Sequence, residues 1–315
     1  MPPQIRIGTR ASKLALIQAG HMQVAIAAAL GYGPDEAERV APLVHISTTG
    51  DRVQDRRLLE IGGKSLFTKE IEEALIAGQI DCAVHSMKDV PAVRQPGLVL
   101  AAIPEREDPR DAFLSLAYDS LDALPQGGRL GTASLRRQAQ ALHRRQDLEI
   151  VMIRGNVDTR LAKLARGEAD AMILALAGLK RMGLESHARA LFDPVTTPPA
   201  PGQGALAIET RAADADADWV QALNHGPSAI TVAAERGALE ALEGSCRTAI
   251  GAHARLDGLR LSLVVEALTP DGRGRFRRQA VIPVGADPEL EARDLGRKLG
   301  AEIGLEGGER LLHVT

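Results

Sequence analysis

The basic residues of this chain gather where predicted strands end. The clearest segment is Gly131-Thr132-Ala133-Ser134-Leu135-Arg136-Arg137, where a strand ends in glycine and small hydroxylated residues and a helix begins. The amides of a helix N-terminus attract anions, and two adjacent arginines add permanently charged forks that bind carboxylate or phosphate. A solvated first turn with Ser134 as the helix cap accounts for the same residues equally well, so this segment alone leaves both interpretations open.

Similar arrangements occur at two other predicted strand ends. Arg154 ends a strand with Arg160 in the following helix, and Arg10 follows the first strand in Thr9-Arg10-Ala11-Ser12. Ligands of open α/β sheets bind beyond the carboxyl ends of the strands. We therefore expect these arginines to line one cleft for a substrate with several carboxylates. The segment Gly62-Gly63-Lys64-Ser65 lacks the leading glycine of a phosphate loop, so no nucleotide site is expected there. Lys64 is interpreted only as a positively charged residue in a loop.

One carboxylate is expected among these cations. Asp89 follows a predicted strand in His85-Ser86-Met87-Lys88-Asp89, and it should stay ionised beside Lys88 and near the arginines. It could stabilise a developing positive charge or shuttle a proton. An aspartate that caps the turn before Pro91 is at least as common, and only the neighbouring cations favour the catalytic role.

The two cysteines match neither a disulfide framework nor a metal-ligand spacing. Cys82 lies in an apolar stretch and is interpreted as a small buried hydrophobic residue. Cys246 follows Gly244 and Ser245 in a predicted loop, and the adjacent Arg247 favours its thiolate. A reactive or covalently modified thiol is therefore a hypothesis, beside the commoner inert loop cysteine. The eight histidines form no metal-binding motif, so no metal is expected.

Alternating strand and helix patterns must position these residues. The first helix is predicted after Ser12 as N-cap, with an apolar stripe at Leu14, Ile17, His21, Val24 and Ala28. The βα alternation indicates mainly parallel sheets. Strands are predicted at 5–9, 43–47, 81–85, 98–103, 111–116, 129–131, 149–153, 171–175, 205–210, 259–267 and 275–283, and further helices at 68–77, 134–145, 157–166, 228–243 and 288–303.

Two segments rich in breakers or charge, 104–110 and 198–204, are interpreted as hinges. The strand after the second hinge is expected to re-enter the first sheet, an arrangement that favours closure around a ligand. Asp271-Gly272-Arg273-Gly274 predicts a hairpin turn. The expected domains are 1–104 with 200–222, 105–199, and a smaller third domain at 223–315.

Composition limits the classes of function. The 315 residues are 45% hydrophobic and 25% charged, which is ordinary for a globular protein. Aromatic residues make up 2% and the net charge is -3, so the basic surface and stacking platforms of a nucleic-acid binder are not expected. No signal segment precedes the first strand, and the longest apolar run is shorter than the roughly 18 residues of a membrane helix. We expect a soluble cytoplasmic protein with neither nucleic acid nor membrane as partner.

Several motifs in the same order resemble the porphobilinogen deaminase (hydroxymethylbilane synthase) family over almost the whole chain. The most specific are His-Ser-Met-Lys-Asp-Val-Pro at 85–91 and Ser-Leu-Arg-Arg at 134–137, with others at 9–12, 49–51, 63–70, 105–113, 154–160, 201–204 and 242–251. The resemblance implies two periplasmic-binding-protein-like (type II) α/β domains with a hinge, and a smaller α+β C-terminal domain that carries a cofactor cysteine. It also implies condensation of four porphobilinogen molecules into hydroxymethylbilane with release of ammonia, in tetrapyrrole biosynthesis, by a monomer.

The resemblance further implies roles for individual residues. Asp89 and Lys88 match the catalytic positions, and one dipyrromethane cofactor per chain is expected in thioether linkage to Cys246. Other cofactor-binding positions are Ser12, Lys88, Asp89, Thr132, Ser134, Arg136, Arg137, Arg160 and Gly204. The implied substrate-binding positions are Arg10, Ser12, Lys64, Phe67, Arg154, Arg160 and Gln203.

The sequence departs from the family pattern near these sites. Ser245 replaces a glycine before the cysteine, and Arg247-Thr248-Ala249 replaces a segment that usually contains proline. Ala133 stands where many members have serine, and Asp158 where a small or neutral residue is common. Two other classes of function fit the residues alone: a non-catalytic anion-binding module, and an unrelated cysteine-dependent transferase with Cys246 as nucleophile.

Overall fold

The computed structural model describes residues 4–52, 67–242 and 248–311 of the chain. Contacts between residues divide the chain into two compact units. One unit holds Met1–Glu107 and Ala205–Ala229, and the other holds Asp108–Gly204 and Ile230–Thr315. The expected division into three domains, with its boundaries at 104, 199 and 222, stays a prediction.

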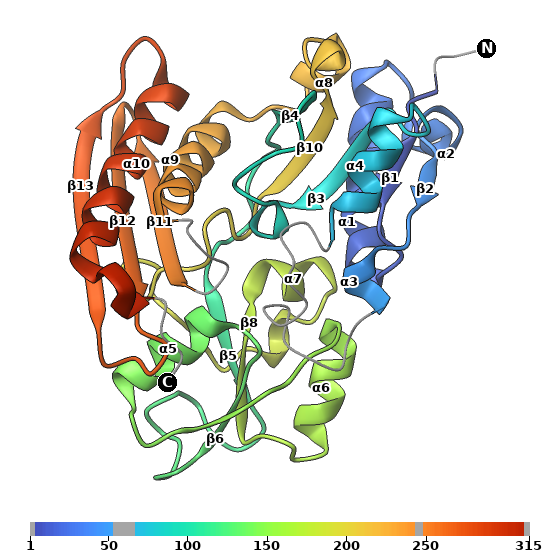
Figure 1. Cartoon of the computed structure of the whole chain (residues 1–315). Helices are drawn as coiled ribbons and strands as arrows, with labels where there is room; N and C mark the ends of the chain where they lie inside the picture. The colour runs from blue at the N-terminus through green and yellow to red at the C-terminus, as the bar shows by residue number, and fades with distance from the viewer. Residues whose placement is uncertain (1–3, 53–66, 243–247, 312–315) are drawn as a thin grey trace. The chain divides into compact units, whose positions relative to one another are not determined.

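The first unit is built on a five-stranded sheet of order β2-β1-β3-β10-β4 (Figure 1). β1 is parallel to both β2 and β3, whereas β10 is antiparallel to its neighbours β3 and β4. The predicted return of the chain to this sheet is therefore confirmed. The strands are β1 (Ile7–Thr9), β2 (Leu43–His45), β3 (Cys82–Ser86), β4 (Leu98–Ala102) and β10 (Leu206–Arg211), and the helices are α1 (Lys13–Ala29), α2 (Ala37–Val40), α3 (Thr49–Arg52), α4 (Lys69–Ile76) and α8 (Asp218–Gln221).

Helix α1 buries a different face from the one predicted. Its buried residues are Gln18, Ala19, Ile26 and Ala27, whereas His21 is exposed and the side chain of Val24 is 42% exposed. The helix is apolar on most sides, so the sequence contains no single stripe that fixes its rotation. The predicted cap is confirmed, because the Ser12 side chain accepts a hydrogen bond from the backbone N–H of Ala15 at 3.4 Å.

The second unit contains a sheet of the same strand arrangement, in the order β7-β6-β8-β5-β9. β6 is parallel to β7 and β8, and β5 is antiparallel to β8 and β9. The α/β fold class is thus confirmed. The strands are β5 (Asp111–Ser115), β6 (Arg129–Gly131), β7 (Glu149–Val151), β8 (Ala171–Ala175) and β9 (Ala190–Leu191), and the helices are α5 (Leu135–Arg144), α6 (Val157–Ala165) and α7 (Leu176–Arg181).

A three-stranded antiparallel sheet, β11-β12-β13, belongs to the same unit (Figure 1). Helices α9 and α10 pack against one face of it in a single hydrophobic cluster. The two helices approach closely, since a Cβ atom at Gly296 of α10 would lie 2.0 Å from the carbonyl oxygen of Ala234 in α9. The elements are β11 (Ala249–Asp257), β12 (Arg260–Leu268), β13 (Arg275–Pro283), α9 (Gly226–Leu242) and α10 (Pro288–Gly307).

Helix α5 packs against the other face of this three-stranded sheet, where Ala139, Ala249 and Leu268 form a small cluster. The predicted hairpin turn between β12 and β13 touches the same helix. Gly272 has a φ of 73°, and a Cβ atom there would lie 2.4 Å from the backbone nitrogen of His143. Only glycine satisfies both the turn conformation and this close approach.

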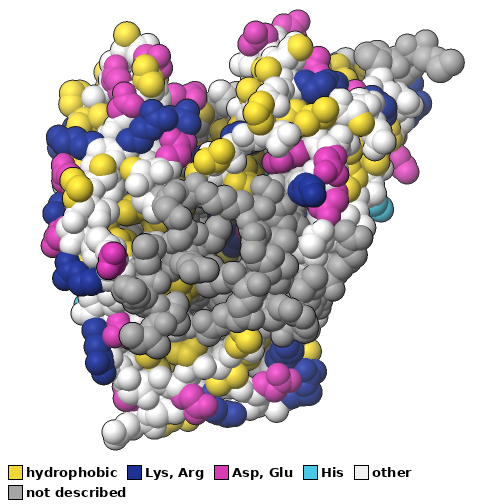
Figure 2. Space-filling view, viewed as in Figure 1, with side chains coloured by type: hydrophobic (Ala, Val, Ile, Leu, Met, Phe, Trp, Pro, Cys, Tyr) yellow, Lys and Arg dark blue, Asp and Glu magenta, His cyan; other side chains and the backbone are white. Residues whose placement is uncertain are grey.

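Among the residues that the structure describes, no single helix is long and apolar enough to cross a membrane. The helical segments Lys13–Ala29 and Pro34–Val40, which are bent by 112° at the break between them, are together long and apolar enough by length and composition only. On the face shown in Figure 2, basic and acidic side chains are interspersed.

Candidate functional site

Two predicted site residues of the first unit follow strands that end at the same edge of the sheet. Arg10 follows β1 and Asp89 follows β3, and these neighbouring strands are parallel, with Ile7 opposite Cys82. Both charges also act on the imidazole of His85, where Asp89 raises the pKa and Arg10 lowers it. The structure therefore brings Arg10 and Asp89 to one edge of the first sheet.

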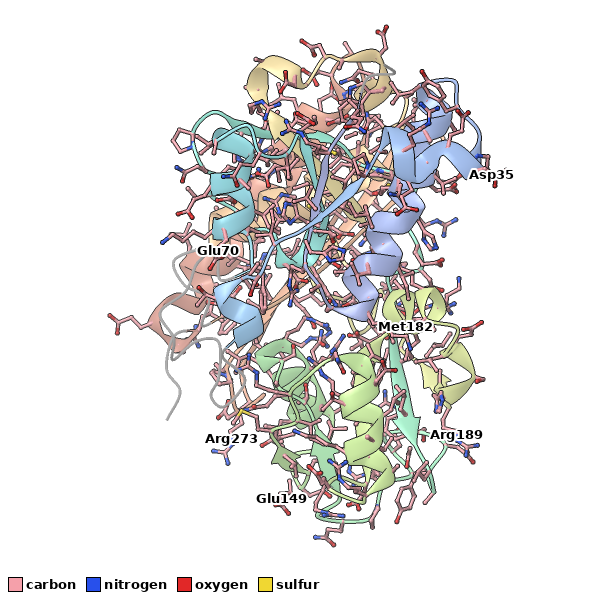
Figure 3. All side chains as sticks on the ribbon, turned by 90° about the vertical axis from the view of Figure 1, so that its right-hand side faces the viewer. Asp35, Glu70, Glu149, Met182, Arg189 and Arg273 are labelled. Atoms are coloured by element: carbon pink, nitrogen blue, oxygen red, sulfur yellow. The ribbon has the colours of Figure 1, made fainter. Side chains whose placement is uncertain are left out.

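Arg10 stacks on Phe67, another predicted site residue. The guanidinium carbon lies 4.1 Å from the centre of the ring, a cation–π contact. A Cβ atom at Gly50 would lie 2.2 Å from the Phe67 ring, so a glycine is required there for the ring to occupy its place. Glu70, at the start of α4 (Figure 3), accepts hydrogen bonds from the N–H and hydroxyl of Thr49 at 2.9 and 2.6 Å and fixes the adjacent segment.

Lys88 and Asp89 are presented on a short 3-10 turn that follows β3. Met87 is buried, whereas Lys88 and Asp89 are exposed. The Met87 N–H donates to the carbonyl of Ala205 at 3.0 Å, and the Val90 N–H donates back to Met87 at 3.1 Å. The buried methionine therefore anchors the turn and leaves its two charged side chains accessible.

The N-terminus of α5 confirms the predicted cap. The Ser134 side chain accepts a hydrogen bond from the N–H of Arg137 at 3.4 Å, and the hydroxyl of Thr132 accepts one from the N–H of Ser134 at 3.1 Å. Capping uses the hydroxyl oxygen of Ser134 as an acceptor, and a hydroxyl also carries one donor hydrogen. The capping role and the predicted cofactor contact are thus chemically compatible.

The guanidinium groups of Arg136 and Arg137 are not exposed to solvent, as those of a surface site would be. Both are buried and pair with the buried carboxylate of Asp111, at 2.8 Å from Arg136 and 2.7 Å from Arg137. Gln203 completes the cluster, because its side chain donates to Asp111 at 3.0 Å and accepts from Arg137 at 3.4 Å. Burial alone would raise the pKa of Asp111, but the two guanidinium charges outweigh burial and hold that pKa well below its usual range.

One nitrogen of this cluster still points to an additional ligand. Among the described residues, the buried Nε of Arg136 has no hydrogen-bond partner. A buried donor without a partner is costly, and such a group in a native protein calls for an unseen acceptor. Arg136 can therefore serve Asp111 and an added carboxylate at the same time.

Replacing Asp111 by Asn should lower the free energy of unfolding by about 3–5 kcal/mol, because two buried guanidinium groups lose their counter-charge. The pKa of Asp111 is lower in the folded than in the unfolded state. Its charge therefore stabilises the protein above the unfolded pKa of about 4, and this contribution is lost as the pH falls through the folded pKa. Denaturant unfolding at pH 7 measures the loss in the variant, and a series of measurements at decreasing pH below about 4 should show the difference from the unmodified protein shrinking progressively.

Asp122→Asn is the matched control, because Asp122 pairs with Arg144 on the surface, where each side chain is 52% exposed. That change should have little effect on stability. If both variants unfold at the same denaturant concentration, the buried cluster does not stabilise the fold.

Gln140 connects this cluster to the C-terminal sheet. Its side-chain nitrogen donates to Glu266 of β12 at 2.7 Å and to the carbonyl of Pro198 at 2.8 Å, and its oxygen accepts from Arg136 at 2.8 Å. Further along the segment that contains Pro198, the Gly202 N–H donates to the buried Glu235 at 2.7 Å. The segment predicted as the second hinge is thus bound within the second unit through Gly202.

Arg154 and Arg160 lie at the neighbouring strand end, because β6 and β7 are parallel with Gly131 opposite Val151. Gly155, with a φ of 117°, makes the turn into α6, and its carbonyl accepts a hydrogen bond from Arg160 Nε at 2.7 Å. The buried Nη1 of Arg154 has no hydrogen-bond partner among the described residues. Like Arg136 Nε, this nitrogen is a buried donor for which the described residues supply no acceptor.

The remaining predicted positions are placed as follows. Gly204 has a φ of 90°, and its carbonyl accepts a hydrogen bond from Arg181 at 2.7 Å. Lys64, Ser245, Cys246 and Arg247 lie outside the described residues. Cys82 is fully buried, and burial raises the pKa of its thiol, so the interpretation of Cys82 as a buried hydrophobic residue is confirmed. The described residues contain no group of His, Cys, Asp and Glu suited to a metal ion.

Sequence reasoning missed the buried charged residues that hold the site. Asp111 begins β5 and is followed by the apolar Ala112, Phe113 and Leu114. Glu209 in β10 follows the apolar Leu206, Ala207 and Ile208, and both carboxylates are buried. A charge inside an apolar strand signals a required partner, because an unpaired buried charge is strongly unfavourable. That signal was available, but the identity of the partners was not.

Comparisons with known proteins agree over nearly the whole chain. Residues 5–218 match the family model described as porphobilinogen deaminase, dipyromethane cofactor binding domain, and residues 229–304 match porphobilinogen deaminase, C-terminal domain. The chain is 65% identical over 315 residues to a porphobilinogen deaminase of Caulobacter vibrioides (strain NA1000 / CB15N), and 63% identical over 315 residues to one of Phenylobacterium zucineum (strain HLK1). Each alignment covers 98% of both proteins.

Similar solved structures include the methionine-binding protein MetQ, with 16% identity and a TM-score of 0.45, over 71% of this chain and 91% of that one. Another is a nutrient-binding protein from Burkholderia cenocepacia bound to methionine, with 20% identity and a TM-score of 0.42. That match covers 70% of this chain and 89% of the other.

Proposed function

Because the chain belongs to the porphobilinogen deaminase family, and is therefore a hydroxymethylbilane synthase, we propose that its buried arginines bind the carboxylates of cofactor and substrate while Asp89 moves the protons. The enzyme joins four porphobilinogen molecules head to tail, releases ammonia at each addition, and yields the linear tetrapyrrole hydroxymethylbilane for tetrapyrrole biosynthesis. Each added pyrrole brings two carboxylates, which explains the need for many guanidinium partners.

The binding proposal is carried by two buried guanidinium nitrogens at neighbouring strand ends, Arg136 Nε and Arg154 Nη1, for which the described residues supply no hydrogen-bond partner. The dipyrromethane cofactor fits such a site, since it carries carboxylates on both rings and guanidinium groups are their strongest partners. When bound, it supplies the covalently held pyrrole to which the first substrate is joined. Arg136 and Ser134 would hold its carboxylates, and Arg154 would bind those of the substrate.

Attachment of the cofactor is proposed at Cys246. The chain has two cysteines, and Cys82 is fully buried with a thiol pKa raised by burial, which makes it a poor nucleophile and leaves no room for an adduct. The other cofactor-binding residues that we propose are Ser12, Lys88, Asp89, Thr132, Arg137, Arg160 and Gly204. The other substrate-binding residues that we propose are Arg10, Ser12, Lys64, Phe67, Arg160 and Gln203.

Asp89 is proposed as the group that serves every addition. Its exposed carboxylate can accept a hydrogen bond from a pyrrole N–H, stabilise positive charge on the ring as ammonia leaves, and take up a proton once the new bond has formed. Lys88, next to it on the same turn, is placed to balance the negative charges of the substrate. A single carboxylate on a fixed turn can repeat these steps for each pyrrole.

Product stoichiometry tests the function directly. The purified protein should consume four porphobilinogen molecules and release four ammonia molecules for each hydroxymethylbilane formed. A non-catalytic anion-binding module, the alternative that the residues alone left open, would bind porphobilinogen and release no ammonia. Absence of ammonia from folded protein would reject the proposed chemistry.

Replacing Arg10 by Met should lower kcat/KM for porphobilinogen by about 10- to 100-fold, because a hydrogen bond between charged groups is lost. Arg10→Lys should recover only part of this loss, since lysine keeps the charge but not the planar fork that stacks on Phe67. Steady-state kinetics measure both variants.

Arg39→Met is the matched control for Arg10, because Arg39 also lies over an aromatic ring, at 5.6 Å from the centre of Tyr32. It should keep kcat/KM within about twofold of the unmodified enzyme, as expected for a surface change. An equal loss in the two variants would show that Arg10 has no specific role.

Two further expectations are proposals as well: that the enzyme works as a monomer and that it acts in the cytoplasm. Size-exclusion chromatography with light scattering tests the first, with a single species near 33.4 kDa as the expected result.

A further inference from the structure

A buried carboxylate lies beside the turn that carries Asp89. Glu209 of β10 has a fully buried side chain, and two groups bind it. His85 Nε2 lies 2.8 Å from one carboxylate oxygen, and Arg94 Nη2 donates to the other. In the chain, His85 precedes the turn Met87–Asp89 and Arg94 follows it. Residues on both sides of the turn therefore bind the same side chain, that of Glu209.

The register of the strands explains why these side chains meet. β10 runs antiparallel to β3, with Glu209 opposite Ala83 and Ala207 opposite His85, so Glu209 and His85 lie on the same face of the sheet. The neighbouring Ile208 belongs to the core on the other face. The register of β10 against β4 also shifts between Ile208 and Glu209, and such a bulge commonly redirects a side chain beside an active site.

The burial of Glu209 makes these contacts obligatory. An ionised carboxylate with no exposed surface is strongly unfavourable unless it is paired and hydrogen-bonded. The Arg94 side chain, 17% exposed, supplies the balancing charge, so the chain after Asp89 cannot move away without leaving both charges unpaired. His85 supplies a hydrogen bond without charge, because burial, together with the positive charge of Arg94, lowers its pKa to about 4.

The geometry points to a positioning role: we propose that Glu209, Arg94 and His85 form an anchor that holds the turn Met87–Asp89 in its working position. This proposal rests on the catalytic role proposed above for Asp89. None of the three residues is assigned to the reacting atoms. The start of the turn is tied to the same strand region a second time, through the hydrogen bond from the Met87 N–H to Ala205.

Arg94→Met tests the anchor. The variant should lose about tenfold or more in kcat, because small displacements of a catalytic group are costly, while KM for porphobilinogen changes by less than about twofold. Arg94→Lys, which keeps the charge, should recover most of kcat. Unchanged kcat in folded Arg94→Met would overturn the proposal.

Arg6→Met is the matched control in the same unit. Arg6 pairs with Asp81 at 2.8 Å, before the start of β3 and away from the turn. It should lower thermal stability without lowering kcat. An equal fall of kcat in Arg6→Met would show a general effect of lost ion pairs and would also overturn the proposal.

The double variant Arg94→Met/Glu209→Gln separates stability from positioning. Removing both charges leaves no unpaired buried charge, so its midpoint of thermal unfolding should lie closer to that of the unmodified enzyme than the midpoint of Arg94→Met does. Its kcat should stay low, because the segment after Asp89 is still not held. Recovery of kcat together with stability would contradict the anchor and indicate a purely structural role.

A proton NMR titration of the His85 ring gives a readout that is independent of activity. The groups that act on this imidazole are Arg94, Glu72, Asp89, Arg10 and the bonded Glu209. Loss of Arg94 should raise the His85 pKa by about one unit or more, because a positive neighbour is removed and a negative one is left. An unchanged titration would show that Arg94 and His85 do not share Glu209.

Asp89→Asn measured in parallel separates this proposal from the proposed function. Normal turnover in Asp89→Asn would reject the catalytic role on which the anchor depends. Loss of turnover in Asp89→Asn together with normal kcat in Arg94→Met would reject the anchor alone.

Discussion

Replacing Asp89 by Asn should reduce kcat for hydroxymethylbilane formation by about 10²- to 10⁴-fold, the range expected when a general acid–base group is removed. Asparagine keeps the size of the side chain but carries no charge at neutral pH and takes up no proton. Asp89 is exposed on its turn, so the thermal unfolding midpoint should be almost unchanged. Single-turnover assays with porphobilinogen, together with thermal unfolding, separate the chemical step from folding.

Asp35→Asn provides the control, since Asp35 is an exposed aspartate in a short 3-10 helix of the same unit (Figure 3). It should turn over at the normal rate. If Asp89→Asn kept kcat within about threefold of the unmodified enzyme, Asp89 would not be the proton-transfer group.

Replacing Cys246 by Ser should abolish both the bound cofactor and turnover. Intact-mass and peptide mass spectrometry of the resting enzyme should find a two-pyrrole adduct on Cys246, and the serine variant should show the mass of the bare chain. A weakly nucleophilic hydroxyl cannot replace a thiolate in forming the thioether. The expected loss of activity is therefore close to complete.

Cys82→Ala is the control, because Cys82 is the other cysteine and is fully buried in β3. It should keep the adduct and most of the activity, with a modest loss of stability from the small cavity. The same measurement distinguishes a cofactor anchor from a turnover nucleophile, since a nucleophile is unmodified between cycles. Active enzyme with an unmodified Cys246 at rest would rule out the anchor.

The sequence predicted most elements because turn residues or a change of periodicity mark their ends. The strands Arg129–Gly131, Ala171–Ala175 and Arg275–Pro283 have the predicted bounds. Strand Ala249–Asp257 was missed, since its core positions include Ala252 and Ala254, and alanine is depleted in strands. Helix α1 was predicted, but the prediction of its buried face was wrong because apolar residues lie on most sides of the helix.

The location of the site at the strand ends was more predictable than the ion pairs within it. Parallel neighbours place the ends of β1 and β3 at one edge, so the proximity of Arg10 and Asp89 follows from the topology. The pairing of Arg136 with Asp111 does not, because the aspartate lies 25 residues earlier in an antiparallel strand. Local sequence patterns show that an arginine follows a predicted strand. They do not show which carboxylate pairs with it, because that depends on long-range packing.

The place of β10 in the first sheet has a consequence for biosynthesis. β4 lies at the edge of that sheet and is paired there through β10, whose residues 206–211 are made long after residue 107, where the first part of that unit ends. At about 5–20 residues per second, roughly 5–20 seconds of translation separate the two. During that interval the emerging chain carries unpaired backbone on β3 and β4, the kind of edge that other chains can join. Ribosome-bound chains truncated between residues 110 and 200 are therefore expected to recruit chaperones, and those extended beyond residue 211 to release them.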